Sequence, residues 1–190
     1  MSLVPPVTQA LILLNTAFFA LDILLSHWLT RWLGLWPIGS GFLPWQVASY
    51  AFLHRDWMHL FFNMLGLFMF GSELERLWGP RRYLLLYGVS VLSAAAAQLL
   101  VGLLIPAGPT IGASGGVFGV TIGYLVYFGN RMVMPVIPPV PIRARYLAIA
   151  YIVIELGTGV WGSPDGVAHS AHLGGALGGY LMIRYWRAHR

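Results

Sequence analysis

A serine and a histidine stand at the starts of two separate apolar segments. Ser114 lies in the run Gly-Ala-Ser-Gly-Gly at 112–116, where an uncharged apolar segment begins, and His172 follows Ala171 at the start of another. A hydroxyl beside an imidazole is a pair used in nucleophilic catalysis, with the imidazole as the base. Polar side chains are costly in hydrocarbon, which favours a functional explanation. If the two segments meet, the serine and the histidine form a nucleophile and its base within a bilayer. The alternative is that the glycines serve only for helix packing and the serine has no catalytic role.

A second polar group precedes them in the stretch His-Arg-Asp-Trp-Met-His-Leu-Phe-Phe-Asn. It contains His54, His59 and Asn63. His59 and Asn63 are four residues apart, so they share one face of a helix. Both side chains can donate hydrogen bonds, as an oxyanion hole requires. A pair of polar residues that merely packs against another helix is the open alternative.

The composition indicates an integral membrane protein. Of the 190 residues, 58% are hydrophobic and 9% are charged, whereas soluble domains carry about 25% charged residues. This shortage of charge excludes disordered and nucleic-acid-binding classes. There is no cysteine, which excludes disulfides, thiolate metal sites and cysteine nucleophiles. The first apolar stretch lacks a positive segment before it and is interpreted as a retained span.

Six segments are long enough to be membrane helices, which need about 20 mainly apolar residues. The predicted spans are 7–29, 57–75, 82–105, 112–129, 145–161 and 167–184. A five-span count is the main rival, because His59 and Asn63 interrupt the second segment and Glu155 interrupts the short fifth one. The connection 30–56 is rich in tryptophan, which suits the headgroup level, so we expect a structured loop partly embedded in the outer leaflet.

The arginines predict the orientation of these spans. All eleven basic residues are arginine, and only Arg31 and Arg55 fall in the long first connection. The other nine follow the second, fourth and sixth spans: Arg76, Arg81, Arg82, Arg131, Arg143, Arg145, Arg184, Arg187 and Arg190. The positive-inside rule therefore places these exits and both termini in the cytoplasm.

Two arguments predict that Ser114 and His172 meet. The fourth and sixth spans run in the same direction, and both residues lie in the first turn, so they share a depth below the extracytoplasmic surface. Small residues also recur every four positions on each span, and such stripes let helices approach closely in lipid. The stripes are Gly115, Gly119 and Gly123 on one span, and Ala171, Gly175 and Gly179 on the other.

The three motifs together resemble the rhomboid family of intramembrane serine proteases. They are Gly-Ala-Ser-Gly, Ala-His-Leu-Gly-Gly and His-x4-His-x3-Asn, and the resemblance covers essentially the whole chain. It implies an all-α membrane protein, with one rhomboid domain over 1–190 that forms a six-transmembrane-helix bundle. It also implies a serine endopeptidase without cofactor or metal, which cleaves membrane-protein substrates in or near their transmembrane helices.

The resemblance also assigns roles to individual residues. Ser114 would be the nucleophile and His172 the general base of a dyad without an acidic third member. The oxyanion would be held by Asn63, His59 and the backbone N–H of Ser114. Phe118 replaces a tyrosine that stacks on the histidine in some members, and its ring should keep the stacking. The remaining supporting positions are His54, Gly112, Gly115, Gly175, Gly179 and Glu75.

Three other functions are considered. A metal-dependent enzyme could use His169 and His172, three apart on one helix, with His54 or His59 and the nearby Asp56 or Asp165. A non-catalytic relative would bind client helices without cutting them, although the chain keeps both the serine and the histidine. A transporter would need charged residues within the spans, where only Asp22 and Glu155 are candidates. The short loops favour a prokaryotic cytoplasmic membrane, with the active site open to the extracytoplasmic side.

Overall fold

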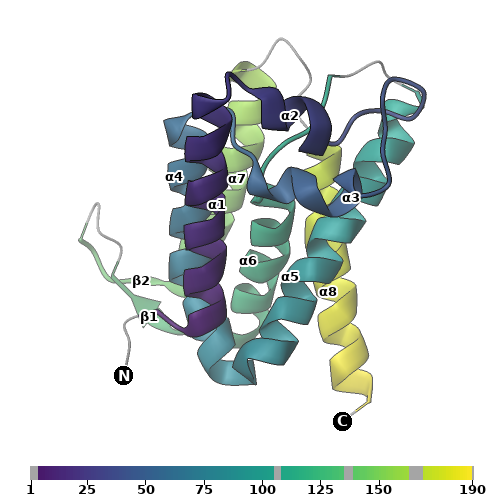
Figure 1. The fold of residues 1–190 in the computed structure, drawn as a ribbon. Coiled ribbons are helices and arrows are strands. Elements are labelled where there is room, and N and C mark those ends of the chain that lie inside the picture. The colour runs from purple at the N-terminus through teal and green to yellow at the C-terminus, as the bar shows by residue number, and fades with distance from the viewer. Residues whose placement is uncertain (1–3, 105–107, 135–138, 163–168, 190) are drawn as a thin grey trace.

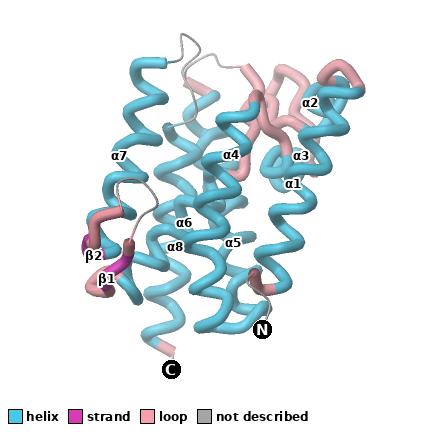
Figure 2. Tube along the Cα trace, turned by 90° about the vertical axis from the view of Figure 1, so that its left-hand side faces the viewer, coloured by secondary structure: helices cyan, strands magenta, loops and turns pink. Residues whose placement is uncertain are grey.

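The computed structural model describes residues 4–104, 108–134, 139–162 and 169–189, with the backbone alone for 154–162. It is mainly a bundle of helices, with both termini at one end (Figures 1 and 2). The long helices are α1 (Pro6–Leu24), α4 (Trp57–Gly66), α5 (Ser72–Gly102), α6 (Ser114–Phe128), α7 (Ala144–Gly162) and α8 (His169–Ala188). The shorter elements are α2 (Trp28–Leu33), α3 (Gln46–Ser49), the 3-10 turn η1 (Tyr50–Phe52), the π-helical turn η2 (Leu67–Gly71), β1 (Met132–Val133) and β2 (Ile142–Arg143).

Two of the described helical stretches are long and apolar enough to cross a bilayer. They are Pro6–Leu24 and the continuous stretch Trp57–Gly102, and two shorter apolar helices cover Ser114–Phe128 and Ala144–Val153. Helix is present within each of the six predicted ranges. The mainly helical architecture agrees with the sequence analysis, and the number of spans stays a prediction.

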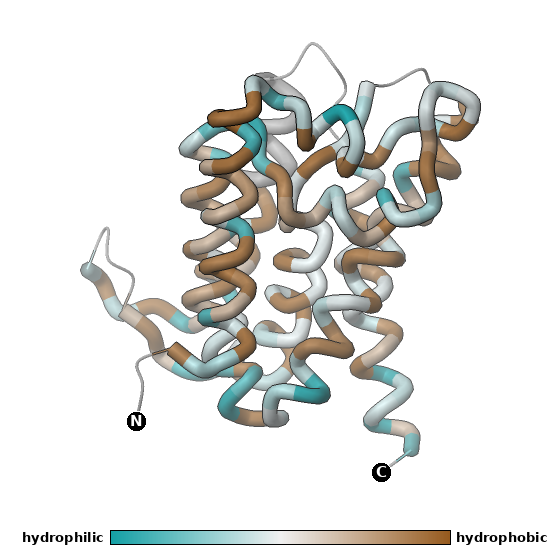
Figure 3. The backbone as a smooth tube through the Cα atoms, in the orientation of Figure 1, coloured by the Kyte–Doolittle hydropathy of each residue, from teal (hydrophilic) through white to brown (hydrophobic). Residues whose placement is uncertain are grey.

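A glycine divides the long helical stretch between the second and third predicted spans. Gly79 has φ +77° and ψ 168°, a conformation outside the helix, and side chains strongly disfavour it. Pro80 follows directly, and its ring presets the first turn of the next helix. Figure 3 shows hydrophilic backbone at this turn and at the end of α8, on the side of both termini. The predicted arginine-rich exit between these segments is thus a sharp turn.

The first predicted span, 7–29, was too long. Helix α1 ends at Leu24, because Ser26 and His27 adopt φ of 51° and 62° and turn the chain into α2. The buried Asp22 stabilises this turn by accepting hydrogen bonds from the backbone N–H and hydroxyl of Thr30, at 3.0 and 2.6 Å. The carboxylate of Asp22, one of the two candidates for a transporter site, therefore caps the start of α2.

The connection 30–56 is structured, as predicted. It contains α2, α3 and η1, and the side-chain oxygen of Gln46 accepts the backbone N–H groups of Trp36 and Leu43 at 3.1 Å each. Four tryptophans in or beside this connection are 46–69% exposed: Trp28, Trp32, Trp45 and Trp57. Such exposure is compatible with headgroup contact, and the depth of the loop in a bilayer stays a prediction.

The sequence analysis missed a short hairpin. Strands β1 and β2 pair antiparallel, with Met132 opposite Arg143 and Val133 opposite Ile142. These strands lie between α6 and α7 at the end of the bundle that carries the termini (Figure 1). The expectation of an all-α protein is therefore wrong for these four residues, because two-residue strands leave no periodic signal.

Helices α5, α6 and α8 form the centre of the bundle and approach each other through small residues. A Cβ atom on Gly175 would overlap the carbonyl oxygen of Gly115, and one on Gly179 would lie 2.6 Å from the Cα of Gly119. Real Cβ atoms do not approach so closely. The predicted contact between the two glycine stripes is thereby confirmed.

Helix α8 has a second glycine face that the sequence analysis overlooked. A Cβ on Gly174 would lie 2.8 Å from the carbonyl oxygen of Ser93, and one on Gly178 would overlap the Ser93 side chain. Adjacent glycines thus let α8 approach two neighbours at once. The stripe 175/179 packs on α6 and the stripe 174/178 packs on α5.

Glu75 joins the first helix to the bundle. Its buried carboxylate accepts the backbone N–H groups of Val7 and Thr8 at 2.9 and 2.7 Å and the hydroxyl of Thr8 at 2.8 Å. The first N–H groups of a helix lack acceptors within the helix. Here the carboxylate of Glu75, 67 residues from Thr8 in the chain, provides the acceptors. Its contacts are those of a structural residue.

Candidate active site

Ser114 and His172 lie in contact. Ser114 is the first residue of α6, and His172 lies in the first turn of α8. The Nε2 atom of His172 is 2.8 Å from the Oγ of Ser114, and both residues are buried, with 5% and 7% exposure. This distance is within the range for a nucleophile and its base. The sequence analysis had predicted this contact from the helix starts and the glycine stripes.

The imidazole of His172 is held flat against a phenyl ring. Phe118 stacks on it with a centroid distance of 4.5 Å and an interplanar angle of 8°. This confirms the predicted stacking. Among the described residues, none hydrogen-bonds to Nδ1 of His172. The first turn of α8 is also fixed to α5, because the hydroxyl of Ser170 donates a hydrogen bond to the side chain of Gln98.

The turn before Ser114 is fixed by the first loop. Gly112 has φ +132°, and its N–H donates to the carbonyl oxygen of Tyr50 at 3.0 Å. The Tyr50 hydroxyl in turn donates to the carbonyl oxygen of Val91 on α5, at 2.9 Å. Leu35 and Thr110 add two backbone hydrogen bonds of 2.9 Å. The sequence analysis missed Tyr50, since an aromatic residue in a loop gives no local signal of this anchoring role.

His59 lies beside the same turn and presents a hydrogen-bond donor to it. A Cβ on Gly112 would lie 2.7 Å from Nε2 of His59, so only glycine leaves room for this ring. The Nδ1 atom of His59 accepts the backbone N–H of Arg55 at 3.4 Å. A neutral imidazole has one protonated nitrogen, so the proton of His59 is on Nε2, on the side of Gly112.

Asn63 is fully buried one turn further along α4. Its Nδ2 donates to the carbonyl oxygen of His59 at 2.8 Å, which leaves its second amide hydrogen for another acceptor. The next turn of α4 packs on α6, where a Cβ on Gly66 would lie 2.6 Å from a methyl carbon of Val117. The structure thus brings the polar face of α4 against the helix that begins with Ser114.

Asp56 begins α4, a role that the sequence analysis did not assign. Its side chain accepts the backbone N–H of His59 at 2.9 Å and the guanidinium of Arg55 at 3.0 Å. Burial alone would raise the pKa of Asp56, but these two hydrogen bonds, together with the charges of Arg55 and His59, outweigh it and lower this pKa below its ordinary value. Asp56 is therefore an N-cap that orients the start of the helix carrying His59 and Asn63.

His54 lies behind His59. Its ring is 1% exposed and meets the His59 ring edge to face, at 4.9 Å and 67°. Within the described part of the chain, neither ring nitrogen of His54 has a hydrogen-bond partner. Burial, with a smaller contribution from His59, lowers the pKa of His54 to about 3. The residue is thus a neutral, buried neighbour of the site.

The alternative of a metal site gains no support from the described residues. No group of three or more His, Asp or Glu side chains among them could hold a metal ion. His172 faces Ser114 and Asp56 caps α4. Asp165 and the side chain of Glu155, named in the sequence analysis, lie outside the described residues.

Comparisons with known proteins agree with this geometry. The model of the Rhomboid domain matches residues 42–188. Rhomboid protein 1, mitochondrial, of Saccharomyces cerevisiae is 33% identical over 145 residues, which cover 74% of the chain and 41% of that protein. Rhomboid protease GluP of Bacillus subtilis is 32% identical over 72% of the chain and 25% of its own length. Rhomboid protease GlpG of Yersinia pestis is 28% identical over 95% of the chain and 62% of its own length. The chain thus spans less than two thirds of each of these relatives.

Proposed function

Because the chain belongs to the rhomboid family, we propose that this integral membrane protein is an intramembrane serine endopeptidase. Ser114 is the nucleophile and His172 the general base. The observation that supports this assignment most is the 2.8 Å contact between the Oγ of Ser114 and Nε2 of His172 in a buried site. The names of two relatives, the rhomboid proteases GluP and GlpG, support the same activity.

The proposed reaction proceeds through an acyl-enzyme. Nε2 of His172 takes the hydroxyl proton as the Oγ of Ser114 bonds to the carbonyl carbon of the scissile peptide. The imidazolium then gives this proton to the leaving amine, and the C–N bond breaks. Water next attacks the ester with His172 again as base, which releases the acid and restores Ser114. The stacked ring of Phe118 fixes the imidazole plane through both steps and faces the cation that forms.

Three donors are proposed to hold the oxyanion: the backbone N–H of Ser114, Nε2–H of His59 and the free amide hydrogen of Asn63. The proton on Nε2 of His59 and the burial of Asn63 support this role. Donors in a site without water stabilise developing charge strongly.

Replacement of Asn63 by alanine tests this assignment. We expect kcat to fall by about 10²–10³-fold, as for loss of an oxyanion donor in other serine proteases. Asn15→Ala is the matched control, because Asn15 is also fully buried and donates to a carbonyl four residues earlier, at 2.7 Å. Equal losses of kcat in the two variants would contradict a role for Asn63 at the oxyanion.

We further propose the topology that the sequence indicates: one domain over 1–190, with six spans and both termini in the cytoplasm. The nine arginines that follow the even-numbered spans support this orientation. The dyad then opens to the extracytoplasmic side, since Ser114 and His172 begin helices that run toward the termini. Substrates are membrane proteins whose helices unwind locally, because a helical peptide bond is shielded by its own hydrogen bonds.

The central experiment is cleavage of a model single-span substrate by purified protein in detergent. We expect cleavage by the wild type, none by Ser114→Ala or His172→Ala, and labelling of Ser114 by a fluorophosphonate. Cleavage by Ser114→Ala would overturn the nucleophile. Binding of the substrate without cleavage by the wild type would favour a non-catalytic relative, and inhibition by chelators without labelling would favour a metal enzyme.

A further inference from the structure

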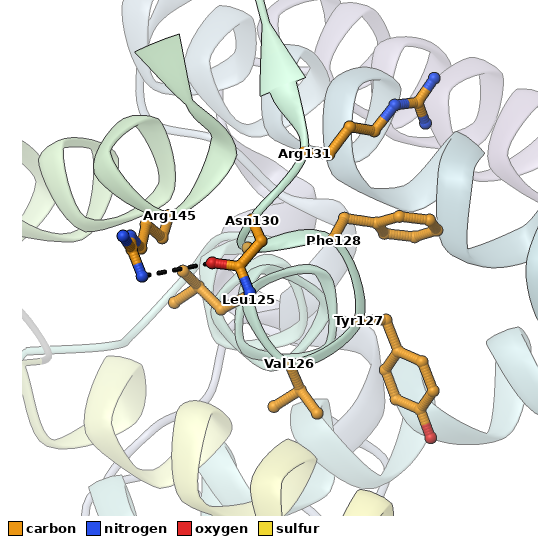
Figure 4. Close-up of a pocket in the computed structure, with 8 residues that line it drawn as sticks. Leu125, Val126, Tyr127, Phe128, Asn130, Arg131 and Arg145 are labelled. Carbon is orange, nitrogen blue, oxygen red and sulfur yellow. Dashed lines mark hydrogen bonds between the residues drawn. The ribbon is translucent and has the colours of Figure 1, made fainter.

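A second polar site lies at the end of the bundle that carries the termini, far from the dyad along α6. A cavity of about 310 Å³ surrounds the end of this helix and is lined by residues 125–131 and Arg145 (Figure 4). Nothing in the proposed proteolysis uses these residues.

Arg145 brings its guanidinium group to the wall of this cavity. One of its terminal nitrogens donates to Oδ1 of Asn130 at 3.2 Å, while its Nε is buried without an acceptor among the described residues. Arg145 also forms no ion pair with any carboxylate that the structure describes. A guanidinium without a carboxylate partner can bind a phosphate oxygen through charge-assisted hydrogen bonds.

The other arginines nearby differ from Arg145. Arg131 points to the opposite side of Asn130 in Figure 4 and pairs with Glu73. Arg143 adds positive charge from strand β2, and backbone hydrogen bonds join the start of α7 to Gly129 and Arg131 at 3.0 and 2.8 Å. With one carboxylate for three arginines, this corner carries an excess of positive charge.

Aromatic rings place the cavity at headgroup depth. Tyr127, which lines it, meets Trp78 edge to face at 5.0 Å, and Trp78 meets Trp186 at 5.5 Å. The guanidinium of Arg82 lies 5.9 Å from the centre of the Trp186 ring. Tryptophan, tyrosine and arginine gather at membrane–water interfaces in this way.

Apolar side chains beside the cavity project outward. Met132, Met134 and Val140, in or next to the hairpin, are 57%, 69% and 54% exposed. A soluble anion would gain nothing from these side chains, whereas a phospholipid presents acyl chains directly beside its phosphate. The combination of an arginine without an ion pair among the described residues and exposed apolar groups therefore favours a lipid.

We propose that this cavity binds the phosphate of an anionic phospholipid, with Arg145 as the main donor and the hairpin against its acyl chains. The lipid would brace the junction of α6 and α7. This inference does not depend on the proposed protease activity, and its test does not use that activity.

The experiment compares wild type, Arg145→Gln and the control Arg187→Gln in lipid nanodiscs. Arg187 is exposed near the end of α8, so its loss removes the same charge at the same end of the molecule. The discs contain phosphatidylcholine alone or with phosphatidylglycerol, and native mass spectrometry measures retained phosphatidylglycerol. We expect Arg145→Gln to reduce its apparent affinity about tenfold, as for loss of a charge-assisted hydrogen bond, and Arg187→Gln to stay within about twofold.

Other outcomes would overturn the proposal. Equal losses in Arg145→Gln and Arg187→Gln would mean diffuse attraction to the anionic surface. If inorganic phosphate added to phosphatidylcholine discs displaced bound phosphatidylglycerol and raised the unfolding temperature as well as the lipid does, the site would be one for free phosphate. Arg145→Lys keeps the charge should Arg145→Gln fail to fold; undiminished lipid retention in that variant would exclude a contact that needs the guanidinium group.

Discussion

Phe118 and Ser114 stand four residues apart on α6, so a single helical turn presents both the proposed nucleophile and the ring that stacks on its proposed base, His172. The position of His172 therefore depends on the same helix that positions Ser114. The backbone N–H of Arg55 donates to Nδ1 of His59, so the proton of the His59 ring is on Nε2. At this scale the site depends on orientation, because one contact sets the direction of each of the rings of His172 and His59.

Truncation of Phe118 should misplace the base without removing it. We expect Phe118→Ala to lower kcat by about tenfold, since a stacked ring contact is worth about 0.5–1.5 kcal/mol, while Phe118→Tyr should stay close to wild type. The measurement is steady-state cleavage of the single-span substrate. Phe61→Ala serves as control, because that ring is 55% exposed; an equal loss there would point to a general effect of removing a ring.

Helices α6 and α8 can bring their first turns together only because no side chain separates them. The glycines at 115 and 119 face those at 175 and 179, and the second face of α8 rests on α5. Within lipid such contacts rely on close packing, since hydrocarbon provides no hydrophobic drive between helices. The distance between Ser114 and His172 is thus a property of helix packing.

A methyl group in this contact should reduce both stability and activity. Gly175→Ala places its Cβ on the carbonyl oxygen of Gly115, and overpacking costs about 1–3 kcal/mol. Gly88→Ala is the control, because a Cβ there would meet nothing within 4 Å, so its stability should change by less than about 0.5 kcal/mol. Thermal unfolding in micelles and substrate cleavage check both variants; a fully active Gly175→Ala would contradict the packing argument.

Glu75 controls the docking of a whole helix. Glu75→Gln leaves one acceptor oxygen for three donors of Val7 and Thr8, and we expect a loss of about 1–3 kcal/mol in the free energy of unfolding. Glu73→Gln is the comparison, because its ion pairs are partly exposed and such pairs are worth about 0–1 kcal/mol. Chemical denaturation in micelles measures both, and a larger loss for Glu73→Gln would contradict the capping role.

At the scale of the whole molecule, the two ends of the helix bundle carry different groups of residues. One end holds the dyad beneath a loop rich in tryptophan, and the other collects the termini, most arginines and the hairpin. Between them, many large apolar side chains of the helices are exposed, as expected for contact with lipid. Among the described residues, few charged side chains lie at the end with Ser114 and His172, so the pH response of the fold there depends on individual groups such as His54 and Asp56.

Protonation of His54 should destabilise the fold in acid. Its pKa in the folded protein, about 3, is below the value of about 6.5 expected when unfolded. Between these values the unfolded chain binds the extra proton, so the free energy of unfolding decreases as pH falls from 6.5 toward 3. Asp56 acts in the same direction at lower pH. Its pKa is lower in the folded protein than in the unfolded chain, so its ionised form stabilises the fold and protonation in acid removes this contribution. Thermal unfolding of wild type and His54→Gln over this range should show a flatter profile for the variant; parallel profiles would exclude His54 as the source.

The sequence by itself determined the membrane class, the approximate helices, and the two residues that we propose as nucleophile and base. It could do so because hydropathy, arginine positions and small-residue spacing are local patterns that need no partner to be read. It also predicted the contact of Ser114 with His172, since glycine stripes mark the faces that must approach.

Only the tertiary structure decided which distant groups hold the site in place. Tyr50 fixes the turn at Gly112, Gln98 fixes the start of α8, and Glu75 caps α1. Each of these contacts joins residues more than 60 positions apart, and the accepting groups, one backbone carbonyl and two side chains, have no local signature in the sequence. Local periodicity records which face of a helix is buried, whereas the choice of partner on that face is made when the helices pack.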